Sequence, residues 1–230
     1  MVHPMIRTVS TTAAVLGLLL AGGLAAEASA PEALTAAPAK GDDAGLDTTQ
    51  AQDVAAVQAY LKSIKSLRAD FTQIAPNHQV STGTLSLEKP GKLRFDYDPP
   101  SPILVVSDGT VITLVDYDLR QVTRWPINDT PLRALVRTNF AFGQDVDVLA
   151  VKRNEQWINV AIADPKKHDE GSMRLTFSRH PLKLTEWEVI DERGAATIVS
   201  LNNLKTNVKL GDSLWDFKDP RPQRHGPPTK

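Results

Sequence analysis

The chain has 230 residues, with 26 Lys+Arg against 27 Asp+Glu and 41% hydrophobic residues, which suits one ordinary globular domain with tails or two small ones. Its net charge of −1 offers no electrostatic basis for wrapping nucleic acid, because that affinity normally comes from neutralising phosphates. The absence of cysteine excludes disulfides, thiolate metal sites, cysteine nucleophiles and acylation of an N-terminal cysteine.

The N-terminal segment has the pattern of an export signal. Arg7 precedes a run rich in Ala, Leu and Gly, and small residues follow it. The apolar core of this run, 13–20, is too short to cross a bilayer, and the alternative of a buried helix would have to accommodate several glycines. We therefore predict a signal peptide over residues 1–28, cleaved after Ala26 or Ala28, and a periplasmic protein that does not span the membrane.

Two further segments have almost nothing to bury. Residues 29–49 are rich in Ala, Pro, Asp and Gly, and residues 219–230 are rich in Pro and mildly basic. Both compositions are typical of disorder, so we expect a disordered leader and a disordered tail. One folded domain over 50–218 remains, within the size of a single core.

A helix is the first element expected in this domain. Four apolar residues recur at intervals of three and four residues, and so share one face of a helix over about 50–66. They are Val54, Val57, Leu61 and Ile64. Thr48 or Thr49 is expected to cap its start, and Asp53 is expected in the first turn, where a negative charge is favoured.

After Leu67 the hydrophobic period changes to two, which predicts strands. The stretches 84–88 and 93–97 both alternate, and the residues between them, 89–92, place Pro and Gly as a type II turn requires, so we predict a hairpin. Eight further strands are expected between turn-forming residues. They cover 103–107, 111–117, 120–126, 146–153, 156–164, 172–179, 183–191 and 196–202.

One helical interruption is expected over about 130–142. Thr130 can act as N-cap and Pro131 as first helical residue, and three apolar side chains follow on one side. They are Leu132, Leu135 and Val136. Two short helices are too few to cover so many strands. The sheet must therefore either close into a barrel filled by its own side chains or leave a concavity that the helices partly cover.

The inner surface is expected to be mostly aliphatic, since aromatic residues make up 6% of the chain. A wall of this kind accepts flexible hydrocarbon but cannot orient a polar substrate. The candidate residues of an acyl-chain cavity are Leu85, Leu87, Leu93, Phe95, Tyr97, Val105, Ile112, Leu114, Ile158, Val160, Met173, Leu175 and Phe177.

Motifs of catalysis are missing from the sequence. It contains no GxSxG, P-loop, dinucleotide-binding or HExxH pattern, and no carboxylate spacing of a calcium loop. His78, His168 and His180 each fall beside turn-like residues, where an exposed histidine is the simpler reading. We predict a protein that is not an enzyme and has no catalytic residue, metal site or cofactor.

An ordered series of short motifs resembles the periplasmic outer-membrane lipoprotein carrier family, the LolA proteins. The likeness covers about 50–218, and each motif is weak alone whereas their order is fairly specific. The matching residues are Phe71-Thr72-Gln73, Gly83, Leu85, 89–97, Pro100, 106–109, 117–123, Thr130-Pro131 with Leu135, and Leu214 with Phe217.

The resemblance implies a mainly β fold with a helical lid: an incomplete antiparallel β-barrel of about eleven strands, covered by short helices around a hydrophobic cavity. It also implies a monomeric chaperone that binds the acyl chains of lipoproteins. Such a chaperone takes its cargo from an inner-membrane ABC-type release complex to an outer-membrane receptor (LolB-like, where present) or directly outward. A lipid-sensing regulator and a carrier of another amphiphilic lipid are the alternatives on the same fold.

The lid that the resemblance implies would present Val54, Val57, Leu61, Leu132, Leu135 and Val136. Family members usually have Arg before the turn proline, where it resembles a latch that bonds the lid backbone, and Lys89 stands there in this sequence. Lysine keeps the charge but loses the planar guanidinium, so a weaker latch is expected, whereas a solvated hairpin lysine is the alternative. A hollow tightly filled by the protein's own residues would contradict the carrier hypothesis.

Overall fold

The computed structural model describes residues 46–222, which form one eleven-stranded antiparallel sheet with a few short helices. The strands are β1 Ser66–Ile74, β2 Val80–Glu88, β3 Lys92–Tyr97, β4 Ile103–Asp108, β5 Val111–Asp116, β6 Gln121–Pro126, β7 Asp147–Arg153, β8 Trp157–Ala163, β9 Gly171–Arg179, β10 Leu182–Asp191 and β11 Ala196–Thr206. The helices are α2 Thr48–Ser63 and α3 Arg133–Val136, with 3-10 turns η1 Ile127–Asp129, η2 His168–Glu170 and η3 Asp212–Trp215. The predicted signal peptide and most of the predicted leader and tail lie outside the described residues.

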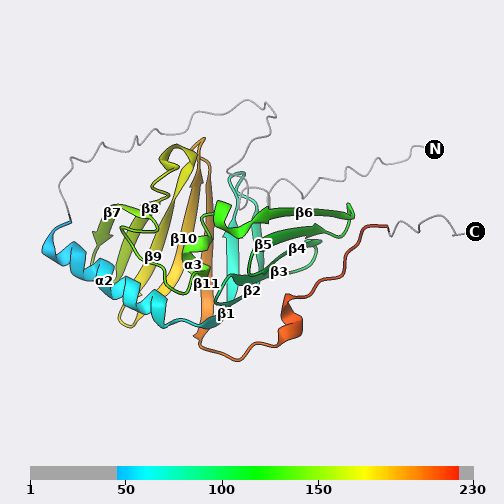
Figure 1. Ribbon diagram of the computed structural model, residues 1–230, viewed down its shortest axis with the longest axis horizontal. Helices are drawn as coiled ribbons and strands as arrows, with labels where there is room; N and C mark the ends of the chain where they lie inside the picture. The colour runs from blue at the N-terminus through cyan, green and yellow to red at the C-terminus, as the bar shows by residue number, and fades with distance from the viewer. Residues whose placement is uncertain (1–45, 223–230) are drawn as a thin grey trace, which may run out of the picture.

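The strand order is β6-β5-β4-β3-β2-β1-β11-β10-β9-β8-β7, so β6 and β7 are the two edges and the sheet is open. The predicted incomplete barrel is confirmed, and the alternative of a closed barrel is wrong. The physical reason lies between the two edge strands. Instead of pairing β6 with β7, the chain crosses the curved sheet as η1, α3 and a loop (Figure 1). The apolar side chains of this crossing segment pack against the concave face of the open sheet. In a closed barrel, side chains of the strands themselves would fill the interior.

The helix α2 begins two residues earlier than expected and ends at Ser63. Asp47 caps it, rather than Thr48 or Thr49, in a reciprocal capping box with Gln50. Asp53 therefore lies beyond the first turn, where it is buried and pairs with Arg153 of β7 at 3.1 Å. The carboxylate thus joins the helix to the sheet, and its effect on the helix dipole is secondary.

The second helix is much shorter than predicted. The segment 130–142 contains a single turn, α3, whose N-cap is Leu132 rather than Thr130. The chain becomes extended at Arg137, and the Val136 carbonyl accepts a hydrogen bond of 3.0 Å from the Gly91 N–H. A contact with the β2–β3 turn therefore ends a helix that local propensity would have continued.

The β2–β3 hairpin is confirmed, although its turn is tighter than the predicted type II turn. The Lys92 N–H donates to the Pro90 carbonyl at 2.9 Å, and Gly91 has φ +75°. The sequence pattern missed β1 as a separate strand. Its alternation is regular, because Leu67, Ala69, Phe71 and Gln73 are all buried while their neighbours are more exposed.

The convex side of the sheet carries a second, smaller apolar cluster of Leu104, Val106 and Val115, against which Phe217 packs. The C-terminal segment is held there by Arg94, which donates to the carbonyls of Leu214 and Asp216 at 3.0 and 2.8 Å. The segment that follows β11 thus covers the outer face of β3–β5 and leaves the concave face to other elements.

Candidate functional site

The concave face of the sheet brings together every residue predicted to line a cavity. All thirteen are at most 8% exposed and belong to one hydrophobic cluster, which spans β2–β5 on one side of β1–β11 and β8–β9 on the other. They reach this common face because inward and outward side chains alternate along each strand.

Three side chains that were not among the predicted cavity residues, Phe71, Gln73 and Trp187, join Phe95 and Tyr97 in the floor of this face. Phe71 packs edge-on against Phe95 and Tyr97 with ring centroids 5.2 and 5.1 Å apart, and Phe95 packs edge-on against Trp187. The Tyr97 hydroxyl bonds Gln73 Oε1 at 2.8 Å. Burial raises the pKa of Tyr97.

Trp187 was missed for an identifiable reason. The pairing of β9 with β10 shifts register between Leu184 and Glu186, so that Leu184 and Trp187 are both buried although they are three residues apart. A bulge of this kind breaks the period of two on which a sequence pattern depends.

Two segments cover the concave face, and we call them together the lid: α2 and the crossing segment 127–146. The six predicted lid residues all contact the core cluster, Val54 as a partly buried neighbour and the other five as buried members. Ile64 and Phe140, at 3% and 1% exposed, extend the same apolar surface. The Phe142 N–H donates to Gln58 Oε1 at 2.9 Å, which links the two lid segments.

The hollow beneath the lid is nearly full, so the expected hydrophobic cavity is closed in this state and the carrier hypothesis requires a lid that moves away. A cavity of about 20 Å³ lies between Leu61, Leu135 and Val136 of the lid and Leu93, Phe95 and Trp187 of the sheet. This is room for about one water molecule. A second hollow of about 70 Å³ opens beside Arg133 and Asp164, over Ile162 and Met173. An acyl chain therefore fits only after the lid has moved, because apolar side chains of the lid pack directly against those of the sheet.

Lys89 bonds the lid backbone. Its Nζ donates to the Leu61 carbonyl, in the last turn of α2, at 2.7 Å. Burial lowers the pKa of this half-buried lysine to about 8. Two backbone bonds lie beside it, because the Lys89 N–H donates to the Lys65 carbonyl and the Gly91 N–H donates to the Val136 carbonyl. The β2–β3 turn therefore contacts both segments of the lid.

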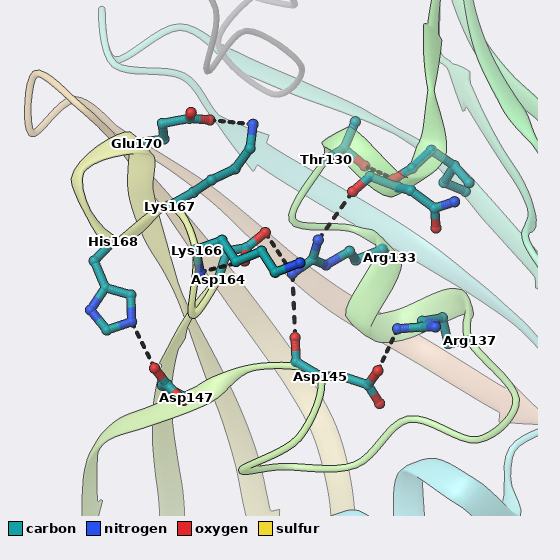
Figure 2. A network of polar contacts seen from close by, with 12 residues as sticks. Thr130, Arg133, Arg137, Asp145, Asp147, Asp164, Lys166, Lys167, His168 and Glu170 are labelled. Carbon is teal, nitrogen blue, oxygen red and sulfur yellow. Dashed lines mark hydrogen bonds and ion pairs between the residues drawn. The ribbon is translucent and has the colours of Figure 1, made fainter.

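A second group of polar contacts joins the crossing segment to the far strands (Figure 2). Arg133 forms an ion pair with Asp164, at the end of β8, at 2.7 Å, and donates to the Asp145 carbonyl at 3.3 Å. Burial raises the pKa of Asp164, but the Lys166 N–H and the Arg133 charge outweigh it and hold the pKa below its usual value. His168 bonds Asp147 nearby and is exposed.

The concave face is dominated by apolar side chains. Within residues 46–222, no three His, Asp or Glu side chains are grouped closely enough to hold a metal ion. None of the helices in this range combines the length and the apolar character that crossing a bilayer requires. What the arrangement offers is an apolar surface under a cover that packs on it through apolar side chains and is also joined to the sheet by polar contacts.

The sequence matches a known family over the part that builds this face. The family described as "Outer membrane lipoprotein carrier protein LolA" matches residues 62–218. The chain belongs to the LolA family. The predicted resemblance is therefore confirmed, and the match covers every strand together with the crossing segment and the C-terminal cover.

Two named carrier proteins agree with this assignment, and one solved structure serves for comparison only. The outer-membrane lipoprotein carrier protein of Legionella pneumophila (strain Paris) is 30% identical over 173 residues, covering 72% of this LolA-family chain and 85% of the relative. The protein of the same name from Chromobacterium violaceum is 28% identical over 182 residues, covering 75% and 86%. A solved LolA superfamily protein from Nitrosomonas europaea is 8% identical with a TM-score of 0.41, covering 71% of this chain and 97% of its own.

Proposed function

We propose that this protein is a periplasmic chaperone that binds the acyl chains of lipoproteins against its concave face and carries them from the inner to the outer membrane. One observation carries the proposal: an extended apolar sheet face is covered by two segments that are not strands of the sheet and that pack on it through apolar side chains. Membership of the LolA family supports the same role.

The same proposal extends to partners and location. An inner-membrane ABC-type complex supplies the cargo, and a LolB-like receptor or the outer membrane itself accepts it. The protein acts as a monomer and catalyses no reaction. Residues 1–28, the proposed signal peptide, lie outside the described residues.

Energetics favour a filled, openable interior over a permanent pocket. Three acyl chains of about fifteen carbons each would gain roughly 36 kcal/mol on burial, at ~0.8 kcal/mol per CH₂. Noncovalent affinity saturates near about −18 to −21 kcal/mol, and a carrier at that limit would not release its cargo. Because lid side chains already occupy the interior, binding an acyl chain exchanges one apolar contact for another. The lid thus lowers the net free energy gained on binding acyl chains to a level that permits their release to an acceptor.

Lys89 is proposed as the latch of this lid. The bond from its Nζ to the Leu61 carbonyl would have to break before α2 moves away. Lysine offers a single flexible ammonium where arginine offers a planar group with several donors, so the closed state is held less strongly than an arginine would hold it.

Lys89→Arg is expected to stabilise the closed lid and to weaken acyl-peptide binding several-fold, because less of the protein is then in the open state. Hydrogen exchange at the amides of 127–146 reports lid opening, and titration with an acylated peptide reports affinity. Lys62→Arg is a matched control on the exposed side of α2. Exchange and affinity both equal to those of the wild type would contradict the latch.

Titration of Lys89 is expected to change stability with pH. Because burial lowers its folded pKa to about 8, the folded protein loses this proton before the unfolded chain does, whose lysine pKa is about 10.4. The contribution of Lys89 to the free energy of unfolding is therefore full above about pH 10.4 and is lost as the pH falls through about 8. The free energy of unfolding of the wild type, compared with Lys89→Met, should rise between these two values. A pH-independent difference would show that Lys89 has an ordinary pKa.

A transfer assay tests the function itself. Purified protein is mixed with inner-membrane vesicles that contain a lipoprotein and its release complex, and the soluble fraction is analysed by native mass spectrometry. An acylated polypeptide bound one-to-one supports the proposal. Free lipid in its place would favour a carrier of another amphiphile, and no bound ligand would favour a regulator.

A further inference from the structure

Trp187 lies on the wall of the cavity beneath the lid. It is 1% exposed and stands opposite Leu175 of β9 and Val199 of β11 in the sheet register. The rest of the wall is aliphatic and aromatic except for Lys89, whose ammonium already bonds the Leu61 carbonyl.

The indole N–H of Trp187 has no hydrogen-bond acceptor among residues 46–222. The other polar aromatic groups of this interior are satisfied, because the Tyr97 hydroxyl bonds Gln73 and the Tyr60 hydroxyl accepts from the Leu184 N–H. The Phe95 ring, edge-on at 6.3 Å between centroids, offers at best a weak π acceptor. A buried unpaired donor is costly and rare, and phenylalanine would place an apolar ring at this position without that cost.

We propose that Trp187 Nε1 donates a hydrogen bond to a carbonyl oxygen of the bound acyl group. This inference rests on the proposed function and specifies its ligand chemistry. The acyl chains of a lipoprotein are attached to it through ester or amide carbonyls, which can accept a hydrogen bond. A plain hydrocarbon chain has no such acceptor. A site with an unsatisfied donor favours ligands that complete it over analogues that lack the acceptor. Trp187 thus selects acyl esters and amides and fixes how deep the linkage enters the cavity.

The experiment compares two synthetic ligands. One is a peptide with an N-terminal dipalmitoylglyceryl cysteine, and the other is its dialkyl ether analogue without the ester carbonyls. The wild type should bind the ester roughly two- to tenfold more tightly than the ether, which is the effect of one neutral hydrogen bond. Trp187→Phe should bind both equally. Because the result is a ratio within each variant, a partly unfolded sample does not change it.

Trp215→Phe is the matched control. Its indole N–H also lacks an acceptor in the described part of the chain, but it lies in η3, on the segment that covers the convex side. It should keep the wild-type ratio. In addition, a ¹³C-labelled ester carbonyl should shift its infrared band on binding to the wild type and not to Trp187→Phe. An unchanged ratio and band in Trp187→Phe would overturn the inference alone, and a wild type that binds neither ligand would overturn the proposed function with it.

Discussion

Replacing Leu135 by aspartate is expected to detach the crossing segment from the sheet while the sheet stays folded. Leu135 is 6% exposed and belongs to the core cluster, at the centre of α3. Burying an unpaired carboxylate there would cost at least several kcal/mol of free energy. Opening the segment instead exposes mainly the side chains of one helical turn. Binding of a fluorescent apolar dye should therefore rise strongly, and amide exchange should accelerate across 127–146 but remain slow in β1 and β11.

Thr138→Asp is the control for this change. Thr138 is exposed three residues further along the same segment, so a carboxylate at this position stays in water. Dye binding should then equal that of the wild type. Equal acceleration of exchange in β1 and β11 would mean that the segment is an integral part of the core, and the idea of a movable lid would fail.

Gly83→Ala is expected to lower the free energy of unfolding by about 3 kcal/mol or more. A Cβ at this position of β2 would stand 2.0 Å from the Asp96 carbonyl oxygen of β3 and 2.8 Å from the Phe71 ring. The carbonyl is backbone and the ring is fixed by its contacts with Phe95 and Tyr97, so neither can move cheaply. Urea unfolding followed by tryptophan fluorescence measures the loss.

Gly211→Ala is the matched control, since no atom other than those of Gly211 and its two chain neighbours lies within 4 Å of the added Cβ. Its effect should stay within about 0.5 kcal/mol. If Gly83→Ala were equally mild, the close approach of β2 and β3 beneath Phe71 would be wrong, and with it the described floor of the concave face.

Regular alternation made most of this fold predictable. The strands β2 to β11 were expected within a few residues of their observed bounds, and the thirteen predicted cavity residues lie on one face because period two alone decides which side a residue takes. The lid was harder to predict. The Val136 carbonyl bonds the β2–β3 turn instead of continuing α3, and no local pattern records a bond between residues so far apart in sequence.

The state of the interior could not be read from the sequence. Composition indicates an apolar wall, but whether side chains from the lid fill the space depends on how far two segments approach the sheet. The contact of Lys89 with the lid backbone was expected from the family resemblance, whereas the position of Trp187 depends on a bulge in β10. The sequence thus predicted which side chains form the apolar faces of the sheet and the lid. The distance between these two faces follows only from the three-dimensional structure.

The strand order has a mechanical consequence. In the described part of the chain, the strands before and after the crossing segment are hydrogen-bonded to each other only along the β1–β11 pair. The outer edges, β6 and β7, are connected by the chain from 127 to 146. About twenty residues reach up to roughly 65–70 Å when extended. A rotation of the two halves about the β1–β11 pair would therefore move β6 and β7 apart, and the segment 127–146 is long enough to stay connected to both. Under the proposed function, such an opening would make room for different numbers of acyl chains without breaking a strand pairing.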